Sequence, residues 1–195
     1  GKMFVMRVFI AAIILILSFQ FPSQADDIRD FEIEGISIGD SALDFFQEDE
    51  IKKNIRDWYP DKKYIYSSIA KKSFEKYDKI GFFYKANDKT YTIVSLSASL
   101  ICKKNINDCK KIQKEVKKEF SILFSELDQN DSIYKYPTSV DNGSGSKAIQ
   151  NAYFFKNGDQ IVIETKDWSK NSKFTDNFSV NLDTEKFSIW LDSIS

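Results

Sequence analysis

The chain has 195 residues, with 28 lysines and arginines against 29 aspartates and glutamates, and it has no histidine. This length suits one domain with a genuine hydrophobic core. Its near-neutral balance of interspersed charges does not match a phosphate backbone, so we expect no nucleic acid as a partner. The lack of histidine excludes Ser-His-Asp and Cys-His hydrolysis and zinc sites built on imidazole. We expect no cofactor and no metal.

The start of the chain has the pattern of a secretory signal peptide. A basic start, an apolar run and small residues before a cleavage site follow one another: Lys2, Arg7, residues 8–17, Ser23 and Ala25. We therefore expect a signal peptide over 1–25, cleavage between Ala25 and Asp26, and a location in the periplasm or outside the cell. The alternative is an uncleaved segment that anchors the chain, and it is the only membrane contact we expect. Residues 26–195 are expected to form a single α+β domain.

The first part of this domain predicts an extended segment followed by two short helices. Apolar and polar residues alternate over 31–39, and Asp40 and Ser41 then have the pattern of a helix cap. The apolar spacing beyond them predicts helices near 41–47 and 49–57.

The next part predicts three strands. A β-rich run over 63–70 precedes a hairpin of 78–86 and 90–102, which turns at Asn87 and Asp88. The second strand of the hairpin keeps a period of two, with apolar residues on one face and serines on the other: Val94, Leu96, Ala98, Leu100 and Cys102 against Ser95, Ser97 and Ser99. Such alternation is typical of a half-buried antiparallel strand.

The clearest helix pattern runs over 106–127, where apolar residues recur every three or four positions and charged residues fill the opposite side. Asn105, with Asp108 three residues later, has the arrangement of an N-terminal cap. The polar stretch 129–147 after the helix is expected to be a mobile surface loop.

Cys102 and Cys109 are the two cysteines of the chain. In an oxidising compartment they predict one local disulfide. A redox pair usually has two residues between its cysteines, and a metal site would need further ligands. We therefore interpret the bond as a structural link between the long strand and the helix.

The last part predicts a second hairpin, with strands over 148–155 and 160–168 and a turn at Asn157 and Gly158. A final strand over 177–182 leads into a terminal helix. The whole order predicts an α+β fold, a single curved antiparallel sheet of about six strands (order α-βββ-α-βββ-α) with helices packed on one face.

Several aromatic side chains lie in polar surroundings or at the ends of predicted elements: Trp58, Tyr59, Tyr64, Tyr66, Tyr134, Tyr136 and Trp168. Flat aromatic faces suit the binding of sugars or peptides. Our candidates for ligand-binding residues are Trp58, Tyr59, Tyr64, Tyr66 and Trp168. The alternative is that these rings fill a small core between the sheet and the helices.

Two resemblances accompany these patterns. The run Gly-Asp-Ser-Ala-Leu at 39–43 resembles the nucleophile block of GDSL-type esterases, but that family uses a later histidine as base. We therefore assign Asp40 and Ser41 to helix capping. Residues 33–46 (Ile-Glu-Gly-Ile-Ser-Ile-Gly-Asp-Ser-Ala-Leu-Asp-Phe-Phe) and 153–159 (Tyr-Phe-Phe-Lys-Asn-Gly-Asp) resemble a group of small exported bacterial proteins of uncharacterised function. That resemblance implies a shared fold and no activity.

Two hypotheses of function follow, and neither has an assigned catalytic residue. The first is a non-enzymatic exported binding or envelope accessory protein whose sheet face or edge contacts a protein or another envelope component. It predicts no deep polar cleft, and a buried convergence of acids with shifted pKa values would contradict it. The alternative is a carboxylate- or lysine-based hydrolase of a wall or extracellular polymer. It requires two carboxyl groups about 5–10 Å apart in a cleft beside Trp58 or Trp168, and it fails if those tryptophans are core residues.

Overall fold

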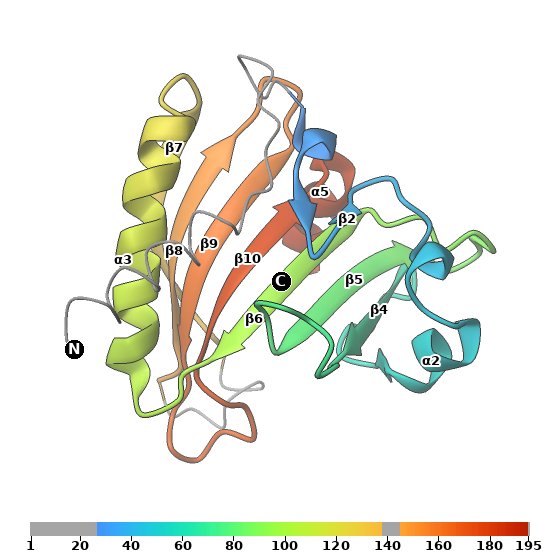
Figure 1. The fold of residues 1–195 in the computed structure, drawn as a ribbon, viewed down its shortest axis with the longest axis horizontal. Helices are drawn as coiled ribbons and strands as arrows, with labels where there is room; N and C mark the ends of the chain where they lie inside the picture. The colour runs from blue at the N-terminus through green and yellow to red at the C-terminus, as the bar shows by residue number, and fades with distance from the viewer. Residues whose placement is uncertain (1–26, 138–144, 195) are drawn as a thin grey trace.

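A computed structural model of the protein describes residues 27–137 and 145–194 (Figure 1). The expected signal peptide, its cleavage site between Ala25 and Asp26, and part of the expected loop lie outside these residues. No helix within 27–137 or 145–194 is both long and apolar enough to span a membrane.

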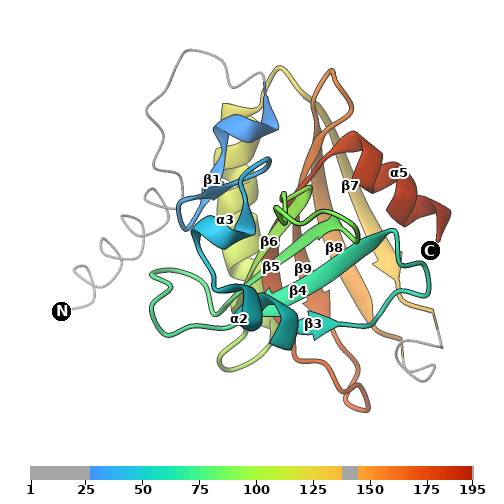
Figure 2. The ribbon, with the colours of Figure 1, turned by 90° about the vertical axis from the view of Figure 1, so that its right-hand side faces the viewer.

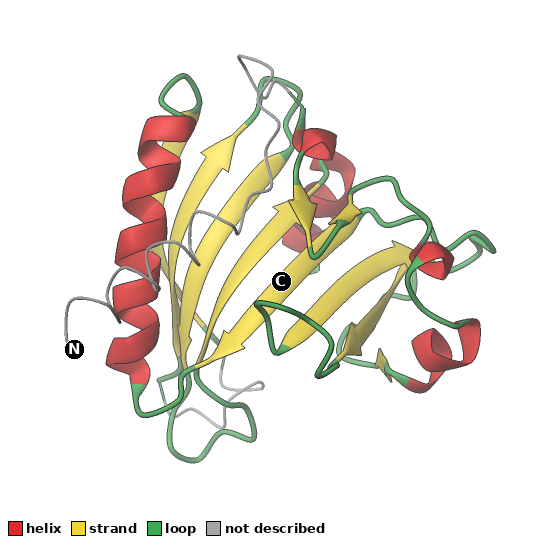
Figure 3. Ribbon diagram, viewed as in Figure 1, coloured by secondary structure: helices red, strands yellow, loops and turns green. Residues whose placement is uncertain are grey.

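More of the described chain lies in strands than in helices (Figure 3). The helices, with η marking 3-10 helices, are η1 (Ile28–Asp30), η2 (Ala42–Asp44), α2 (Glu48–Lys53), α3 (Ile106–Leu123) and α5 (Glu185–Ser193). The strands are β1 (Glu32–Ile33), β2 (Ile36–Ser37), β3 (Ile55–Arg56), β4 (Tyr64–Ile69), β5 (Lys79–Lys85), β6 (Ser95–Ile101), β7 (Asp128–Lys135), β8 (Lys147–Phe154), β9 (Gln160–Asp167) and β10 (Asn177–Asp183).

Within the described residues, eight strands form one antiparallel sheet in the order β3-β4-β5-β6-β10-β9-β8-β7, and β1 and β2 form a separate two-stranded sheet. The chain builds the large sheet in two meanders, β3 to β6 and β7 to β10, which α3 connects. The two meanders meet where β10 pairs with β6, from Asn177 opposite Ile101 to Asp183 opposite Ser95. This central pairing places the serine side of β6 beside a polar side of β10.

The predicted sheet of about six strands with all helices on one face is wrong. β3 and β7 extend the sheet at its two edges, and α3 and α5 lie on opposite sides of it (Figure 2). We call these sides the α3 face and the α5 face. β3 has two residues, and every residue of β7 is exposed, so neither has the apolar alternation by which strands are recognised. β7 also covers residues 129–135 of the stretch 129–147, where a loop is expected.

The α3 face carries the larger hydrophobic core. Val116 and Phe120 of α3 are buried there against β9 and β10 and against the N-terminal segment that contains η1, β1 and β2. The ring of Phe31 lies with its centroid 5.3 Å from that of Phe124 and 5.9 Å from that of Phe155. Each such buried side chain stabilises the fold by about 1.5–3 kcal/mol relative to an exposed one.

The α5 face has a smaller core at one end of the sheet. Phe187 and Trp190 of α5 pack on Tyr64 and Phe83, with ring centroids 4.5 Å apart for Phe83 and Phe187. The Trp190 indole donates a hydrogen bond to the Asp61 carboxylate at 3.0 Å, which ties α5 to the segment before β4. This small core covers only one end of the α5 face, and polar side chains occupy the centre of that face.

Two local predictions about α3 are confirmed. Cys102 and Cys109 form a disulfide with their Cα atoms 5.5 Å apart, and it links the end of β6 to the first turn of the helix. Asn105 caps the helix, because its side chain accepts a hydrogen bond from the Asn107 N–H at 2.9 Å. A disulfide fits an extracellular or periplasmic location.

Ser41 also has the capping role that the sequence predicts. Its hydroxyl oxygen accepts a hydrogen bond from the Leu43 N–H at 3.2 Å, at the start of η2. The Asp40 carboxylate accepts another from the Ser37 N–H at 2.8 Å. These two hydrogen bonds give Asp40 and Ser41 a structural role in the local turn.

Candidate functional site

A strip of polar side chains, which we call the polar strip, crosses the α5 face at the centre of the sheet. The period of two brings residues of four neighbouring strands to it: Ser95, Ser97 and Ser99 of β6, Asn177, Ser179, Asn181 and Asp183 of β10, Glu164 and Lys166 of β9, and Gln150 of β8. Ser95, Ser179, Glu164 and Asp183 are buried. Because buried polar groups are destabilising without partners, hydrogen bonds determine how this strip is arranged.

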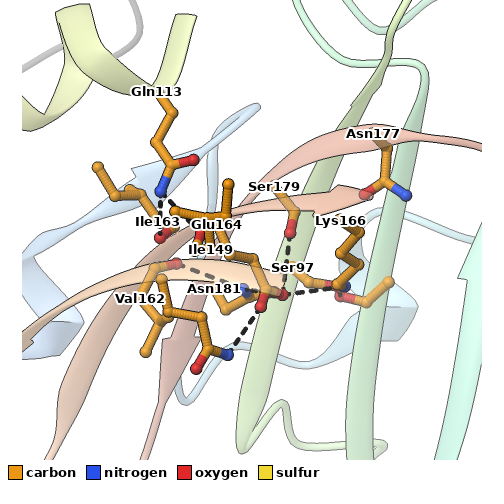
Figure 4. A network of polar contacts seen from close by, with 12 residues as sticks. Ser97, Gln113, Ile149, Val162, Ile163, Glu164, Lys166, Asn177, Ser179 and Asn181 are labelled. Carbon is orange, nitrogen blue, oxygen red and sulfur yellow. Dashed lines mark hydrogen bonds and ion pairs between the residues drawn. The ribbon is translucent and has the colours of Figure 1, made fainter. Parts of the chain in front are cut away.

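Glu164 is the centre of the network, as Figure 4 shows. Its Oε1 accepts hydrogen bonds from Asn181 Nδ2 at 3.0 Å and Ser179 Oγ at 3.2 Å, and it lies 2.9 Å from Lys166 Nζ. Its Oε2 accepts a further hydrogen bond from Gln150 Nε2 at 2.9 Å. The carboxylate is therefore held by four donors from three strands.

Burial and charge oppose each other in the Glu164–Lys166 pair. Burial alone would raise the pKa of Glu164, but the Lys166 ammonium and the hydrogen bonds from Gln150 and Asn181 outweigh burial and lower that pKa. Burial likewise disfavours the charged form of Lys166, but the Glu164 carboxylate more than offsets this and raises the pKa of the lysine. Both groups are thus charged at neutral pH, and together they are electrically neutral.

Tyrosine hydroxyls lie near the lysine end of the pair. Burial raises the pKa of Tyr59 to about 12, although the Lys166 charge acts in the opposite direction. Burial also raises the pKa of Tyr136, again against the effect of Lys166. Among the described residues, Glu164 is the one hydrogen-bonding partner of the Lys166 ammonium. Since an ammonium has three N–H donors, Lys166 keeps capacity to bind an oxygen of another molecule.

Asp183 is a second buried carboxyl group on the same face. Its Oδ1 accepts a hydrogen bond from Ser95 Oγ at 2.6 Å. Burial raises the pKa of Asp183 to about 6, and the negative charge of Glu164 adds to the rise, while the Ser95 hydrogen bond opposes it. In the register of β9 with β10 the two acids are four positions apart, which corresponds to about 13 Å along the strands.

Five aromatic rings, which we call the aromatic arc, border the polar strip. Their centroids are separated by 5.2 Å for Tyr66 and Trp58, 5.9 Å for Trp58 and Phe174, 4.5 Å for Phe174 and Trp168, and 4.3 Å for Trp168 and Tyr136. The rings come from distant parts of the chain, and Trp58 keeps 50% of its surface exposed. The arc therefore combines a continuous series of ring contacts with at least one accessible ring.

Tyr66 reaches from the arc onto the sheet because Gly81 leaves room for it. A Cβ atom on Gly81 would collide with the Tyr66 hydroxyl and would lie 2.7 Å from Ser97 Oγ. The glycine thus lets the tyrosine hydroxyl approach the serine side of β6.

Two buried polar atoms near Lys166 have no hydrogen-bond partner among the described residues: Trp168 Nε1, a donor, and Asn177 Oδ1, an acceptor. Asn177 is directly opposite Lys166 in the β9–β10 register. A buried donor or acceptor without a partner costs about 1–3 kcal/mol. The interior of the site therefore contains unsatisfied hydrogen-bonding capacity of both kinds.

The structure brings three of the five aromatic candidates together and separates the other two. Trp58, Tyr66 and Trp168 belong to the aromatic arc. Tyr59 lies between the arc and the α5 core, with its ring centroid 5.7 Å from that of Trp190. Tyr64 is a core residue, 4% exposed.

Sequence reasoning missed the charged pair at the centre of the site. Glu164 and Lys166 alternate with the buried residues Ile163 and Thr165 in β9, and such alternation usually marks a face in contact with water. The signal that could have found them is the matching polar alternation in the final strand, since adjacent strands share a polar face.

Within the described part of the chain, no group of three or more acidic or cysteine side chains is placed to hold a metal ion. Comparison of the chain with family models, curated proteins and solved structures finds no match. The geometry of the α5 face is therefore the basis on which a function is proposed.

Proposed function

We propose that the protein is an exported binding protein that holds a neutral, hydroxyl-rich ligand of the carbohydrate class on the α5 face. The observation that carries this proposal is the position of the Glu164–Lys166 pair between a floor of amides and hydroxyls and the rings of the aromatic arc. The disulfide supports export to the periplasm or the cell exterior.

The balance of charge favours a neutral ligand. Glu164 and Lys166 compensate each other, and four donors already bind the carboxylate, three of them at Oε1 and one at Oε2. An anionic ligand would compete with Glu164 for Lys166 and leave the buried carboxylate without its counter-charge, which is strongly unfavourable.

The mixture of donors and acceptors favours hydroxyl groups. Lys166 can donate, and the protonated hydroxyls of Tyr59 and Tyr136 can both donate and accept. Sugar hydroxyls also act in both ways, and the apolar faces of sugar rings pack on flat aromatic surfaces such as Trp58.

A carboxylate-based hydrolase is the weaker candidate for the same face. Two buried acids, Glu164 and Asp183, lie on this face, and the pKa of Asp183 is raised. A shifted pKa of a buried acid is one of the features expected of an enzyme. The pKa of Glu164, however, is lowered, and its oxygens are occupied, so it is a poor proton donor or nucleophile. The positions of the two acids are also about 13 Å apart, beyond the separation that glycosidases use.

The proposal is tested by calorimetric titration with neutral oligosaccharides of the cello-, chito- and malto-series. We expect at least one series to bind, and Trp58→Ala to weaken its binding about three- to tenfold through lost ring stacking. Ile189→Ala is the matched control, because Ile189 is 62% exposed on α5 and is outside the site.

Two results would reject the proposal. One is that none of the three series binds, and the other is that the Trp58 and Ile189 variants bind equally well. Chromatography of the same mixtures distinguishes the alternative, since a hydrolase would release shorter sugars and a binding protein leaves the oligosaccharides intact.

A further inference from the structure

β7 is an edge strand with unusually complete exposure. It is the last strand of the large sheet, and all of its residues, Asp128–Lys135, are exposed. It pairs with β8 without interruption, from Asp128 opposite Phe154 to Lys135 opposite Lys147. Edge strands are usually short, bulged or interrupted by proline, because an open edge is a template for another strand. β7 has none of these features.

The hydrogen-bond pattern shows which backbone groups of β7 face outward. The Tyr136 N–H donates to the Ser146 carbonyl at 3.0 Å, just beyond the end of the strand. Alternate residues of an antiparallel strand face the same neighbour. The N–H and C=O groups of Gln129, Asp131 and Ile133 therefore point away from β8, and the side chains of these residues lie on the α3 face.

A basic hollow lies beside this edge. It has a volume of about 600 Å³ between α3 and the pair β7–β8, and its walls include Lys110, Lys114 and Lys117 of the helix and Asp131 and Ile133 of the strand. The lysines are four and three positions apart, so they share one side of the helix. Lys110 lies 3.9 Å from the Asp167 carboxylate of β9, and Lys117 pairs with Asp131, so the three lysines exceed their acidic partners by one positive charge.

Side-chain hydrogen bonds hold α3 and the edge strand in this arrangement. The buried amide of Gln113 donates to Asn151 Oδ1 at 2.8 Å, and Asn151 Nδ2 donates to Asp131 Oδ1 at 2.7 Å. Asp131 also forms an ion pair with Lys117. Lys114 has no ion-pair partner among the described residues, so its charge remains available.

We propose that the open edge of β7 binds an extended acidic segment of a partner protein, which adds a strand to the sheet and places its acidic side chains against the α3 lysines. Main-chain hydrogen bonds to the outward groups of β7 would provide affinity, and the lysines would select for acidic residues. This site is separate from the proposed carbohydrate site, which is on the other face.

The spacings of helix and strand are compatible. Residues on one face of an added strand are about 6.6–6.8 Å apart. Lys110 and Lys114 are separated by about 6 Å along the helix, because each residue rises 1.5 Å. α3 meets β7 at the ion pair between Lys117 and Asp131, and Lys114, one turn earlier in the helix, lines the same hollow. An acidic residue on the α3 side of the added strand would therefore lie nearest to Lys114.

A second copy of this chain fits the edge less well. Antiparallel pairing of two β7 strands in one sheet would place both α3 helices on the same side of the junction. The lysine rows of the two copies would then face each other, and like charges brought together in this way are unfavourable.

The test uses the purified chain and a fluorescent peptide of sequence Thr-Glu-Val-Glu-Val-Glu-Thr, with the lysine counterpart Thr-Lys-Val-Lys-Val-Lys-Thr as control, followed by fluorescence anisotropy. Ile133→Pro removes an outward N–H at an edge position that tolerates proline, and Ile133→Thr is its matched control. Lys114→Gln tests the charge, and Lys111→Gln, on the same helix but not in the hollow, is its control.

We expect the acidic peptide to bind and the lysine peptide not to bind. Ile133→Pro should reduce affinity at least tenfold relative to Ile133→Thr, and Lys114→Gln should reduce it about two- to fivefold relative to Lys111→Gln. Hydrogen exchange at the Ile133 amide should slow when the peptide is bound.

The proposal is overturned if the acidic peptide does not bind at millimolar concentration, if both peptides bind alike, or if each variant matches its control. It is also overturned if the wild-type chain sediments as a dimer that Ile133→Pro dissociates, since the edge would then serve a second copy. The charge variants keep the test decisive even if the proline variant fails to fold.

Discussion

Replacing Lys166 with methionine removes the cation from a buried ion pair and leaves the carboxylate of Glu164 behind. The side chain of Glu164 is 8% exposed and that of Lys166 is 24% exposed, so solvent screens the pair poorly. Breaking such a pair by removing one partner costs about 3–5 kcal/mol. Glu164 would keep its hydrogen bonds from Gln150, Ser179 and Asn181, so we expect a loss near 3 kcal/mol. For a chain of this size that loss corresponds to a melting temperature lower by about 6–12 °C.

The pH dependence of the variant has a definite sign. In the wild-type protein the pKa of Glu164 is lowered, so its contribution to stability is present above the usual glutamate range and is lost as the pH falls. Without Lys166, burial is no longer outweighed and the pKa of Glu164 rises. The variant should therefore lose less stability at pH 5, where Glu164 can take up a proton, than at pH 7.

A double-mutant cycle isolates the interaction between the two residues. Glu164→Gln leaves Lys166 with partial access to water, and we expect it to cost about 1–2 kcal/mol. Because the double variant contains neither charge, it should be more stable than the sum of the single losses predicts, by about 1.5–3 kcal/mol. Urea unfolding at pH 7 and pH 5 measures all four proteins. Additivity within about 0.5 kcal/mol at pH 7 would refute the reasoning, because it would mean that the pair does not interact in the fold.

Three further predictions concern other parts of the molecule. Removing the disulfide by Cys102→Ser with Cys109→Ala opens a loop of sequence separation 7 and should cost about 2–3 kcal/mol, so a melting temperature unchanged in calorimetry contradicts its stabilising role. Asp183 has a folded pKa of about 6, above its unfolded value, so unfolding free energy should fall by up to about 3 kcal/mol as the pH rises from about 4 to about 6. Asp183→Asn should remove that slope in urea unfolding, and a slope that persists assigns it to other groups. Gly81→Ala places a methyl group against the Tyr66 hydroxyl and should cost about 1–3 kcal/mol and weaken sugar binding, whereas wild-type stability and affinity would show that Tyr66 can move freely.

Local rules predict those elements whose stability is decided within a few neighbouring residues. β6 is recognisable because Leu96 and Ala98 fill the α3-face core while Ser97 occupies the opposite side. The turn between β8 and β9 is recognisable because Gly158 adopts a φ of 87°, which Asn-Gly turns require. The strands and α3 expected from such signals are present, with ends that differ by a few residues.

The predictions fail where an element depends on a partner that is distant in sequence. The expected helix near 49–57 ends at Lys53, because Ile55 and Arg56 instead pair with Ser67 and Tyr66 of β4. β7 is exposed on both faces and is a strand only because β8 pairs with it along its whole length. Neither pairing leaves a periodic trace in its own segment, so the number of strands could not be obtained from periodicity.

The candidate site also depends on segments that are distant in sequence, because they cover its side of the sheet. In an open strand, Glu164 and Lys166 would form a surface pair worth about 0–1 kcal/mol. Here α5 and the loops that carry Trp58 and Trp168 cover their side of the sheet, and the contact of Trp190 with Asp61 joins segments 129 residues apart. Coverage leaves the Glu164 side chain 8% exposed and raises the importance of its hydrogen bonds, so the same two residue types change from a solvated face into the centre of a site. A site formed in this way has no sequence motif, and its residues are identified by the contacts that enclose them.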